Sequence, residues 1–213
     1  MSQTKINVGM IEGSGTPGSG NFLRGDGSWQ AAGGGAWTLI GSATASSSAS
    51  IGVTGLDRTA YDQYGIGISG VQPVSDGQSP RIQIGGSGGL ENGSGNWLWH
   101  TQQSVHNATV YGTARSTASY STGILSSWEI SSETFGTGNQ TGEMYFAMLY
   151  LNINTERPMY FGTYTNTNGS GVAYGGTTFG AMLVDVDITQ IQLHMTSGNI
   201  LAGRLTVWGI KYS

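Results

Sequence analysis

The chain has 213 residues and a formal net charge of −4, and 9% of its residues are charged, against roughly 25% in ordinary soluble proteins. Its eight lysines and arginines form no basic patch for nucleic acid or for an anionic membrane, and no run of about eighteen apolar residues could insert into a bilayer. The absence of cysteine excludes disulfides, thiol catalysis and cysteine-bound zinc. We therefore expect a protein with a polar but nearly uncharged surface, no nucleic-acid partner and no membrane insertion.

Residues 1–35 have the composition of an extended, glycine-rich arm. Ile6 and Val8 begin a short apolar edge of near-alternating period that could pair with a partner strand. From 13 to 29 the sequence reads GSGTPGSGNFLRGDGSW, in which glycine and proline oppose a helix or a packed strand. Phe22 and Trp29 bracket a compact turn in this segment, made by Leu23, Arg24, Gly25, Asp26 and Gly27. We expect it to order against another surface, most simply against copies of itself.

Residues 36–213 show strand-like runs separated by turn sequences. No stretch of helical length has an apolar period of 3.6 residues, and Asn-Gly and Asp-Gly pairs supply turns. Apolar residues alternate clearly at Ile66 and Ile68, and again at Ile191 and Leu193. The pattern predicts an all-β domain, a jelly-roll-like β-sandwich head. Its expected strands are 37–43, 49–53, 64–71, 81–85, 97–103, 123–130, 142–152, 159–164, 182–186, 190–196 and 201–212.

Trp97 and Trp99 form the most prominent aromatic site. On a strand both indoles lie on one face and Leu98 lies on the other, with His100 directly after them. A solvent-facing indole can contact the apolar C–H face of a sugar while neighbouring amides meet its hydroxyl groups. The alternative is that one or both indoles pack in the core, as large aromatic side chains usually do.

The polar stretch 166–176 reads as a long loop that could recognise a saccharide. Tyr164 precedes it, and Asn166, Asn168 and Tyr174 lie within it. Tyrosine with small polar residues is typical of adaptable recognition loops. A plain solvated connector is the alternative.

The carboxylates give no clear metal site. Asp185 and Asp187 would share one face of the expected strand 182–186 and its end, and Asp57 and Asp62 flank a turn. A good calcium site needs about six to eight oxygen ligands, and no such spacing is present. We expect no metal and no cofactor.

Catalysis has equally little support. None of the histidines (His100, His106 and His194) has metal-ligand spacing, and no serine-hydrolase motif occurs. Glycosidase chemistry needs two carboxyl groups on opposite sides of a glycosidic bond. The candidates for that pair are Glu129, Glu133 and Glu143. We expect a protein that is not an enzyme, with polysaccharide hydrolysis as the least favoured alternative.

Both ends of the chain resemble a known family. Gly15-Thr-Pro17 and Phe22-Leu-Arg-Gly-Asp-Gly-Ser-Trp29 are similar to the arm of tail-fibre and head-fibre proteins of tailed bacteriophages and gene-transfer agents. The runs at 37–46 and 50–56 resemble the opening of that family's β-sandwich head, and residues 197–213 resemble its closing strand. In that family the arm joins an attachment region to a terminal head.

The resemblance implies a structural virion protein, made in the bacterial cytoplasm and exposed on the particle. Residues 1–35 would attach to another virion protein and to further copies in a homotrimer, and residues 36–213 would be a head that binds host-surface polysaccharide. A capsid decoration or head-fibre protein with a purely structural role is the alternative. The arm contacts would come from Ile6, Val8, Phe22, Leu23, Arg24, Asp26 and Trp29. The candidate saccharide contacts are Trp97, Trp99, His100, Tyr164, Asn166, Asn168 and Tyr174.

Overall fold

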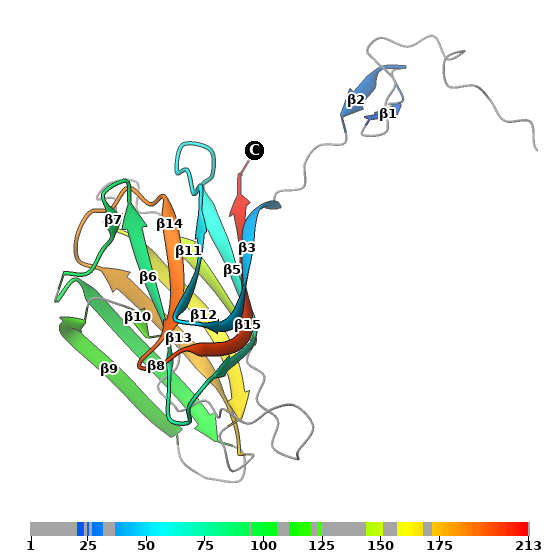
Figure 1. Cartoon of the computed structure of the whole chain (residues 1–213). Helices are drawn as coiled ribbons and strands as arrows, with labels where there is room; N and C mark the ends of the chain where they lie inside the picture. The colour runs from blue at the N-terminus through cyan, green and yellow to red at the C-terminus, as the bar shows by residue number, and fades with distance from the viewer. Residues whose placement is uncertain are drawn as a thin grey trace, which may run out of the picture. The chain divides into compact units, whose positions relative to one another are not determined.

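A computed structural model describes residues 21–31 except 24 and 26, and then 37–93, 95–105, 111–120, 123–124, 144–150, 157–167 and 172–212. The chain divides into two compact units, Met1–Gly35 and Ala36–Ser213. In the first unit β1 (Asn21–Leu23) and β2 (Trp29–Ala31) form an antiparallel hairpin (Figure 1). Gly27 has a φ of +78°, which glycine adopts without strain in the turn between them.

The described part of the second unit contains strands and no helix, which confirms the expected all-β class. All of its strand pairings are antiparallel. The strands are β3 (Trp37–Ser48), β4 (Ser50–Thr54), β5 (Gln63–Pro73), β6 (Pro80–Gly86), β7 (Gly89–Leu90), β8 (Trp97–Val105), β9 (Tyr111–Tyr120), β10 (Gly123–Ile124), β11 (Met144–Tyr150), β12 (Met159–Thr167), β13 (Ala173–Met182), β14 (Gln190–Met195) and β15 (Ile200–Ile210).

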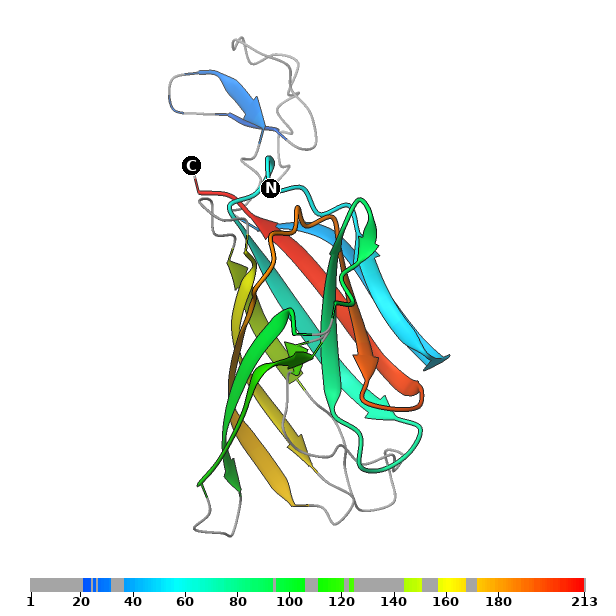
Figure 2. The same cartoon turned by 90° about the vertical axis from the view of Figure 1, so that its left-hand side faces the viewer.

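These strands form two sheets that pack as a sandwich (Figure 2). The large sheet has eight strands in the order β3-β15-β5-β11-β12-β13-β8-β9. The small sheet has the order β10-β6-β14-β4, with β7 paired to β6. Successive strands often alternate between the sheets, as in a jelly roll. The chain changes sheet between β3 and β4, β4 and β5, β5 and β6, β7 and β8, β9 and β10, β10 and β11, β13 and β14, and β14 and β15.

The core lies between the inward faces of the two sheets. On the large sheet Ile66, Ile68 and Leu205 are fully buried, and on the small sheet Ile82 and Leu193 face them in the same cluster. Burying one such side chain stabilises the fold by roughly 1.5–3 kcal/mol. The alternation at Ile66 and Ile68 and at Ile191 and Leu193, expected from sequence, is confirmed.

Two expected elements are wrong. The strand expected at 182–186 is a connection, because β13 ends at Met182 and β14 begins at Gln190. The long loop expected at 166–176 is mostly strand, since β12 runs to Thr167 and β13 begins at Ala173. The glycines of β13 explain the second error. A Cβ at Gly176 would meet the backbone oxygen of Gln102, and one at Gly180 would meet the ring of Tyr160, so these glycines permit close strand packing.

Candidate functional site

The two tryptophans of the expected saccharide site lie inside the sandwich. Trp97 is 0% exposed and Trp99 is 7% exposed. Trp97 packs against Tyr160 of β12, with ring centroids 6.2 Å apart. The two indoles do share one face of β8 while Leu98 lies on the other, as expected. That face is the inward one, so the idea of a solvent-facing indole platform is wrong.

The other expected saccharide contacts divide in the same way. Tyr164 and Asn166 are buried on the inward face of β12, and they cannot meet a ligand at the surface. Tyr174 is half-buried in β13, and Asn168 lies outside the described residues. His100 is half-buried on the outward face of β8, with its ring centroid 5.4 Å from that of Phe179. The structure therefore does not bring the predicted site together.

Most of the expected arm contacts lie outside the part of the chain that the structure describes. Those are Ile6, Val8, Arg24 and Asp26, together with the side chain of Phe22. Leu23 and Trp29 are opposite each other in the hairpin, with Leu23 exposed and Trp29 half-buried. A two-stranded hairpin with strands of three residues is at most marginally stable in isolation.

The outward face of the large sheet carries a row of large apolar residues that sequence reasoning missed. We call Trp37, Leu39, Met159, Phe161 and Phe179 the outer apolar face; their side chains are 42% to 61% exposed. The strand registers place the residues of one row next to each other across seven strands, in the order Leu39, Trp208, Gly65, Met148, Phe161, Phe179 and His100. Leu39, Phe161 and Phe179 therefore lie in one row, and the register places Trp37 and Met159 in the neighbouring row.

Two glycines of β5 leave room for the indole rings of Trp37 and Trp208 to lie close to the sheet. The ring of Trp37 lies where a Cβ of Gly65 would be, and the ring of Trp208 lies 2.9 Å from the Cβ position of Gly67. The two indoles meet edge to face, with centroids 6.2 Å apart. Glycine in a strand often marks such a close approach, and the sequence pairs Gly65 and Gly67 with no neighbouring tryptophan that would reveal it.

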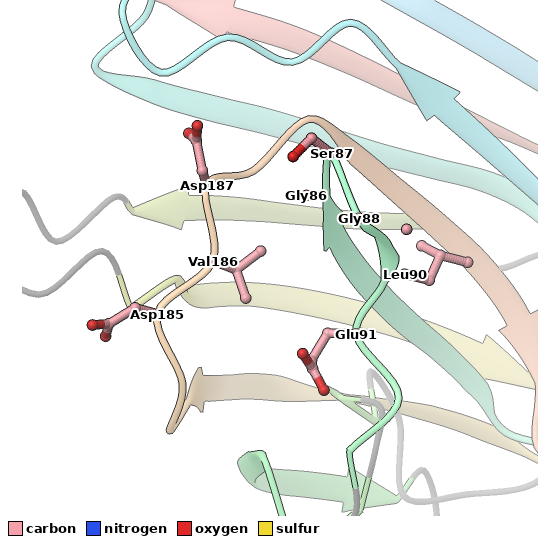
Figure 3. Close-up of a pocket in the computed structure, with 9 residues that line it drawn as sticks. Gly86, Ser87, Gly88, Leu90, Glu91, Asp185, Val186 and Asp187 are labelled. Atoms are coloured by element: carbon pink, nitrogen blue, oxygen red, sulfur yellow. The ribbon is translucent and has the colours of Figure 1, made fainter.

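An open pocket of about 300 Å³ lies beside the turn between β6 and β7 (Figure 3). One wall is the glycine-rich turn, and the other is the connection between β13 and β14. Carboxyl groups come from both walls, Glu91 from the first and Asp185 and Asp187 from the second, while Leu90 and Val186 supply apolar surface. The full lining is Gly86, Ser87, Gly88, Gly89, Leu90, Glu91, Asp185, Val186 and Asp187.

Each carboxyl group of the pocket has a partner. Arg58 lies 3.0 Å from an oxygen of Asp187, and Arg157 lies 3.2 Å from one of Asp185. Both aspartates keep exposed side chains, at 63% and 61%.

Glu91 has a structural partner in its own loop. Its Oε1 accepts hydrogen bonds from the backbone N–H of Gly93 at 2.7 Å and from Nδ2 of Asn96 at 2.8 Å. A carboxylate has more lone pairs than these bonds use, so all three groups of the pocket can still accept hydrogen bonds from a ligand.

The expectation that Asp185 and Asp187 alternate on a strand is wrong, because both lie in the connection between β13 and β14. Within the described residues no group of three His, Cys, Asp or Glu side chains is placed to hold a metal ion. Asp57 acts locally: its carboxylate accepts hydrogen bonds from the side chain and the backbone N–H of Thr59, which lower its pKa. Asp62 accepts a backbone hydrogen bond from Tyr212.

Three titratable groups of the described interior have shifted pKa values, Tyr64, Tyr160 and His194. Burial raises the pKa of the Tyr64 and Tyr160 hydroxyls well above the ordinary value. His194 has a lowered pKa, because burial disfavours its charged form and Arg81 lies nearby. The glycosidase candidates Glu129, Glu133 and Glu143, and also His106, lie outside the described residues.

No long, apolar helix that could cross a membrane occurs in the described residues. No protein family, no curated protein and no solved structure matches this chain.

Proposed function

We propose that the chain is a structural virion protein, a fibre or spike tip whose head attaches a phage-like particle to host-surface polysaccharide. Three features support this: the arm sequence with its Phe22–Trp29 motif, the separation of arm and head into two units, and the β-sandwich head. The arm would dock on another virion protein and gain there the support that its small hairpin needs. The protein would therefore be found on the particle surface, as part of a homotrimer.

The observation that carries the attachment proposal is the pocket between the Gly86–Gly89 turn and Asp185–Asp187. Sugar hydroxyl groups donate to carboxylate oxygens, and their oxygens accept from arginine and backbone donors. Leu90 and Val186 offer apolar surface to the C–H face of a sugar ring. About 300 Å³ is the lower end of the volumes that small-molecule sites occupy, which suits one or two sugar units. Several heads on one particle would turn weak contacts into firm attachment.

The test is binding of the purified full-length protein to host cells and to their extracted capsule or lipopolysaccharide. The variant Asp185→Ala with Asp187→Ala removes both aspartates of the pocket, and it should weaken binding about tenfold or more. Both side chains are exposed and their ion pairs lie at the surface, so the fold should lose no more than about 1 kcal/mol. Asp76→Ala is the matched control, since Asp76 is an exposed carboxyl group that does not line the pocket.

Saturable binding that the double variant loses and the control keeps would support attachment through this pocket. Equal binding by all three proteins would reject the pocket. Release of short sugars from the polysaccharide would favour a depolymerase, whose candidate carboxyl groups Glu129, Glu133 and Glu143 are not described.

A second candidate is a capsid decoration or head-fibre protein with no receptor. The exposed outer apolar face favours it, because a decoration protein packs against its neighbours, whereas Trp97 and Trp99 lie in the protein's own core and favour neither role. Absence of polysaccharide binding at the multivalency of a particle, together with binding to purified capsids, would establish this role.

A further inference from the structure

The two sheets of the head present opposite chemistry on their outward faces. On the small sheet the outward positions of β6 and β14 are half-buried polar residues, Arg81, Gln83, Gln190, Gln192 and His194. That is the ordinary pattern of an antiparallel sheet with one face toward water. On the large sheet the corresponding positions hold the outer apolar face, with Phe161 and Phe179 each 50% exposed. The outward face of the small sheet thus shows which residue types this protein places on a sheet face that lies against water.

Charge is sparse on the described part of the large sheet's outward face, where the register of β9 places Arg115 beside His100. Along β12 the outward residues are Met159, Phe161, Thr163 and Thr165, and along β13 they include Thr177, Phe179 and Ala181. Arg204 is the one charged residue among the described outward positions of β5, β8, β12, β13 and β15. A surface of this kind can be covered without burying unpaired charges, which would cost several kcal/mol each.

The face is large enough for a stable contact. Six strands from β15 to β8 lie side by side, and β13 has ten residues. At about 4.8 Å between strands and about 3.3 Å per residue, the whole face measures about 24 Å by 33 Å, or about 800 Å². Its apolar residues lie toward one end of β12 and β13 and its threonines toward the other. A specific protein–protein contact buries roughly 800 Å² on each partner. Single exposed apolar residues need no partner, but a contiguous patch marks an interaction site.

We propose that this outward face of the large sheet is the surface through which heads of a second and further copies of this chain associate. The inference deepens the proposed function, which includes self-association, by naming the surface that makes it. Interfaces between identical subunits are more apolar than other contacts. In a homotrimer the same apolar face of each copy can turn toward the threefold axis and pack against its neighbours there. A saccharide fits this surface less well, because the side chains of Met159, Phe161 and Phe179 carry no hydrogen-bonding group for its hydroxyls.

Met159 provides a readout that is specific for this face. Its side chain is 42% exposed in the single chain, so dilute protein should be oxidised there rapidly by peroxide. The experiment measures Met159 sulfoxide by mass spectrometry across a protein dilution series, with the molar mass followed by sedimentation. We expect an oligomer at high concentration in which oxidation of Met159 slows about tenfold or more, and rapid oxidation once dilution releases monomers.

The variant Phe161→Thr with Phe179→Thr removes the centre of the patch. Threonine suits an outward strand position, and this face already carries Thr163 and Thr177. Loss of two phenyl groups from each copy should weaken association on the order of 100-fold and restore rapid oxidation of Met159 at all concentrations. Val74→Thr is the matched control, because Val74 is 45% exposed in the turn after β5 and does not lie on the large sheet's face. It should associate as the native chain does.

A monomer at about 100 μM would overturn the proposal, and so would an oligomer in which Met159 is oxidised as fast as in the double variant. The second outcome would place the contacts between copies elsewhere, for instance in the arm. Neither measurement uses polysaccharide, so failure here leaves the attachment proposal standing, and failure of polysaccharide binding leaves this one standing.

Discussion

The outward faces of the two sheets differ although their inward faces form one core. Toward the core both sheets present aliphatic and aromatic residues in strict alternation, such as Ile66 and Ile68 on β5 and Ile191 and Leu193 on β14. Away from the core the small sheet is polar, while the large sheet carries large exposed apolar residues together with threonines. Alternating apolar residues show that one face of a strand is buried. The residue types on the outward face indicate whether that face lies against water or against another surface. For the large sheet, the exposed apolar residues support the proposed contact with further copies of the chain.

The largest expected effect comes from comparing a tryptophan of the inward face with a phenylalanine of the outward one. Trp97→Ala should lower the free energy of unfolding by about 3–5 kcal/mol, because it empties a fully buried indole site beside Tyr160. Phe179→Ala, at a position already 50% exposed, should cost about 1 kcal/mol or less in dilute protein. Urea unfolding of both variants measures the difference. Similar costs would mean that the outward face is part of the monomer's own core.

Two glycine-to-alanine variants compare a glycine that faces the core with one that faces outward. Gly180→Ala should destabilise the head by about 1–3 kcal/mol, because its Cβ would meet the Tyr160 ring and also, at 2.8 Å, the backbone oxygen of Leu98.

Gly65→Ala is the matched variant on the outward face. Its Cβ would meet only the far end of the exposed Trp37 side chain, which can move aside, so we expect a cost below about 1 kcal/mol. Thermal unfolding of the two variants at low concentration ranks them. The opposite ranking would show that Trp37 is fixed on the sheet and is not available to a partner.

A polar residue of the small sheet should matter more to the fold than an apolar residue of the outer face. Nε2 of Gln83 donates to the backbone oxygen of Glu91 at 2.7 Å in a part-buried setting. Gln83→Ala should therefore cost about 0.5–1.5 kcal/mol. Phe161→Thr should stay within about 0.5 kcal/mol in dilute protein, although it weakens association. A larger cost for Phe161→Thr than for Gln83→Ala, measured by urea unfolding, would contradict the assignment of that phenylalanine to an interface.

The sequence alone predicts the fold class and most strands. It does not predict which face of a strand is buried, because that depends on strands far away in the sequence. The Trp97-Leu-Trp99 pattern correctly paired the two indoles on one face of β8, but alternation cannot say which face is inward. In β12 the choice is harder still, because Tyr160 and Phe161 are both large and aromatic. Only the position of the small sheet, which is set by contacts far apart in sequence, decides that Tyr160 is buried.

The sequence does not predict the candidate pocket for the same reason. The sequence indicates Asp185 and Asp187 as neighbours. Glu91 lies about a hundred residues away and joins them in the pocket only through the pairing of β6 with β14. The glycines of β13 also favoured a loop from sequence alone. In the structure a neighbouring backbone or ring occupies the space beside Gly176 and Gly180, which glycine in a strand permits. Long-range packing, rather than local preference, fixed each of these features.

The smallest effect that we expect is a pH dependence that originates on the outward face of the small sheet. His194 is half-buried there, opposite Arg81 of β6 and Ser50 of β4, and its Nδ1 lies 2.8 Å from the backbone oxygen of Met195. Burial and then the charge of Arg81 hold the pKa of His194 below its ordinary value, against the opposing effect of the Met195 carbonyl. As pH falls through about 6.5, the unfolded chain takes up a proton that the folded chain resists. The free energy of unfolding should therefore fall with decreasing pH until the folded-state pKa is reached.

One proton limits this slope to about 1.4 kcal/mol per pH unit. Urea unfolding of the native chain and of His194→Gln between pH 7.5 and pH 5.5 isolates the contribution, because the glutamine has no proton to gain while the carboxyl groups titrate equally in both proteins. The native chain should lose more stability over this range than the variant. If the two proteins show the same pH dependence, then His194 is accessible to water in the folded state. The small sheet's polar face would then be more open than its half-buried residues indicate, and the contrast with the large sheet would become stronger.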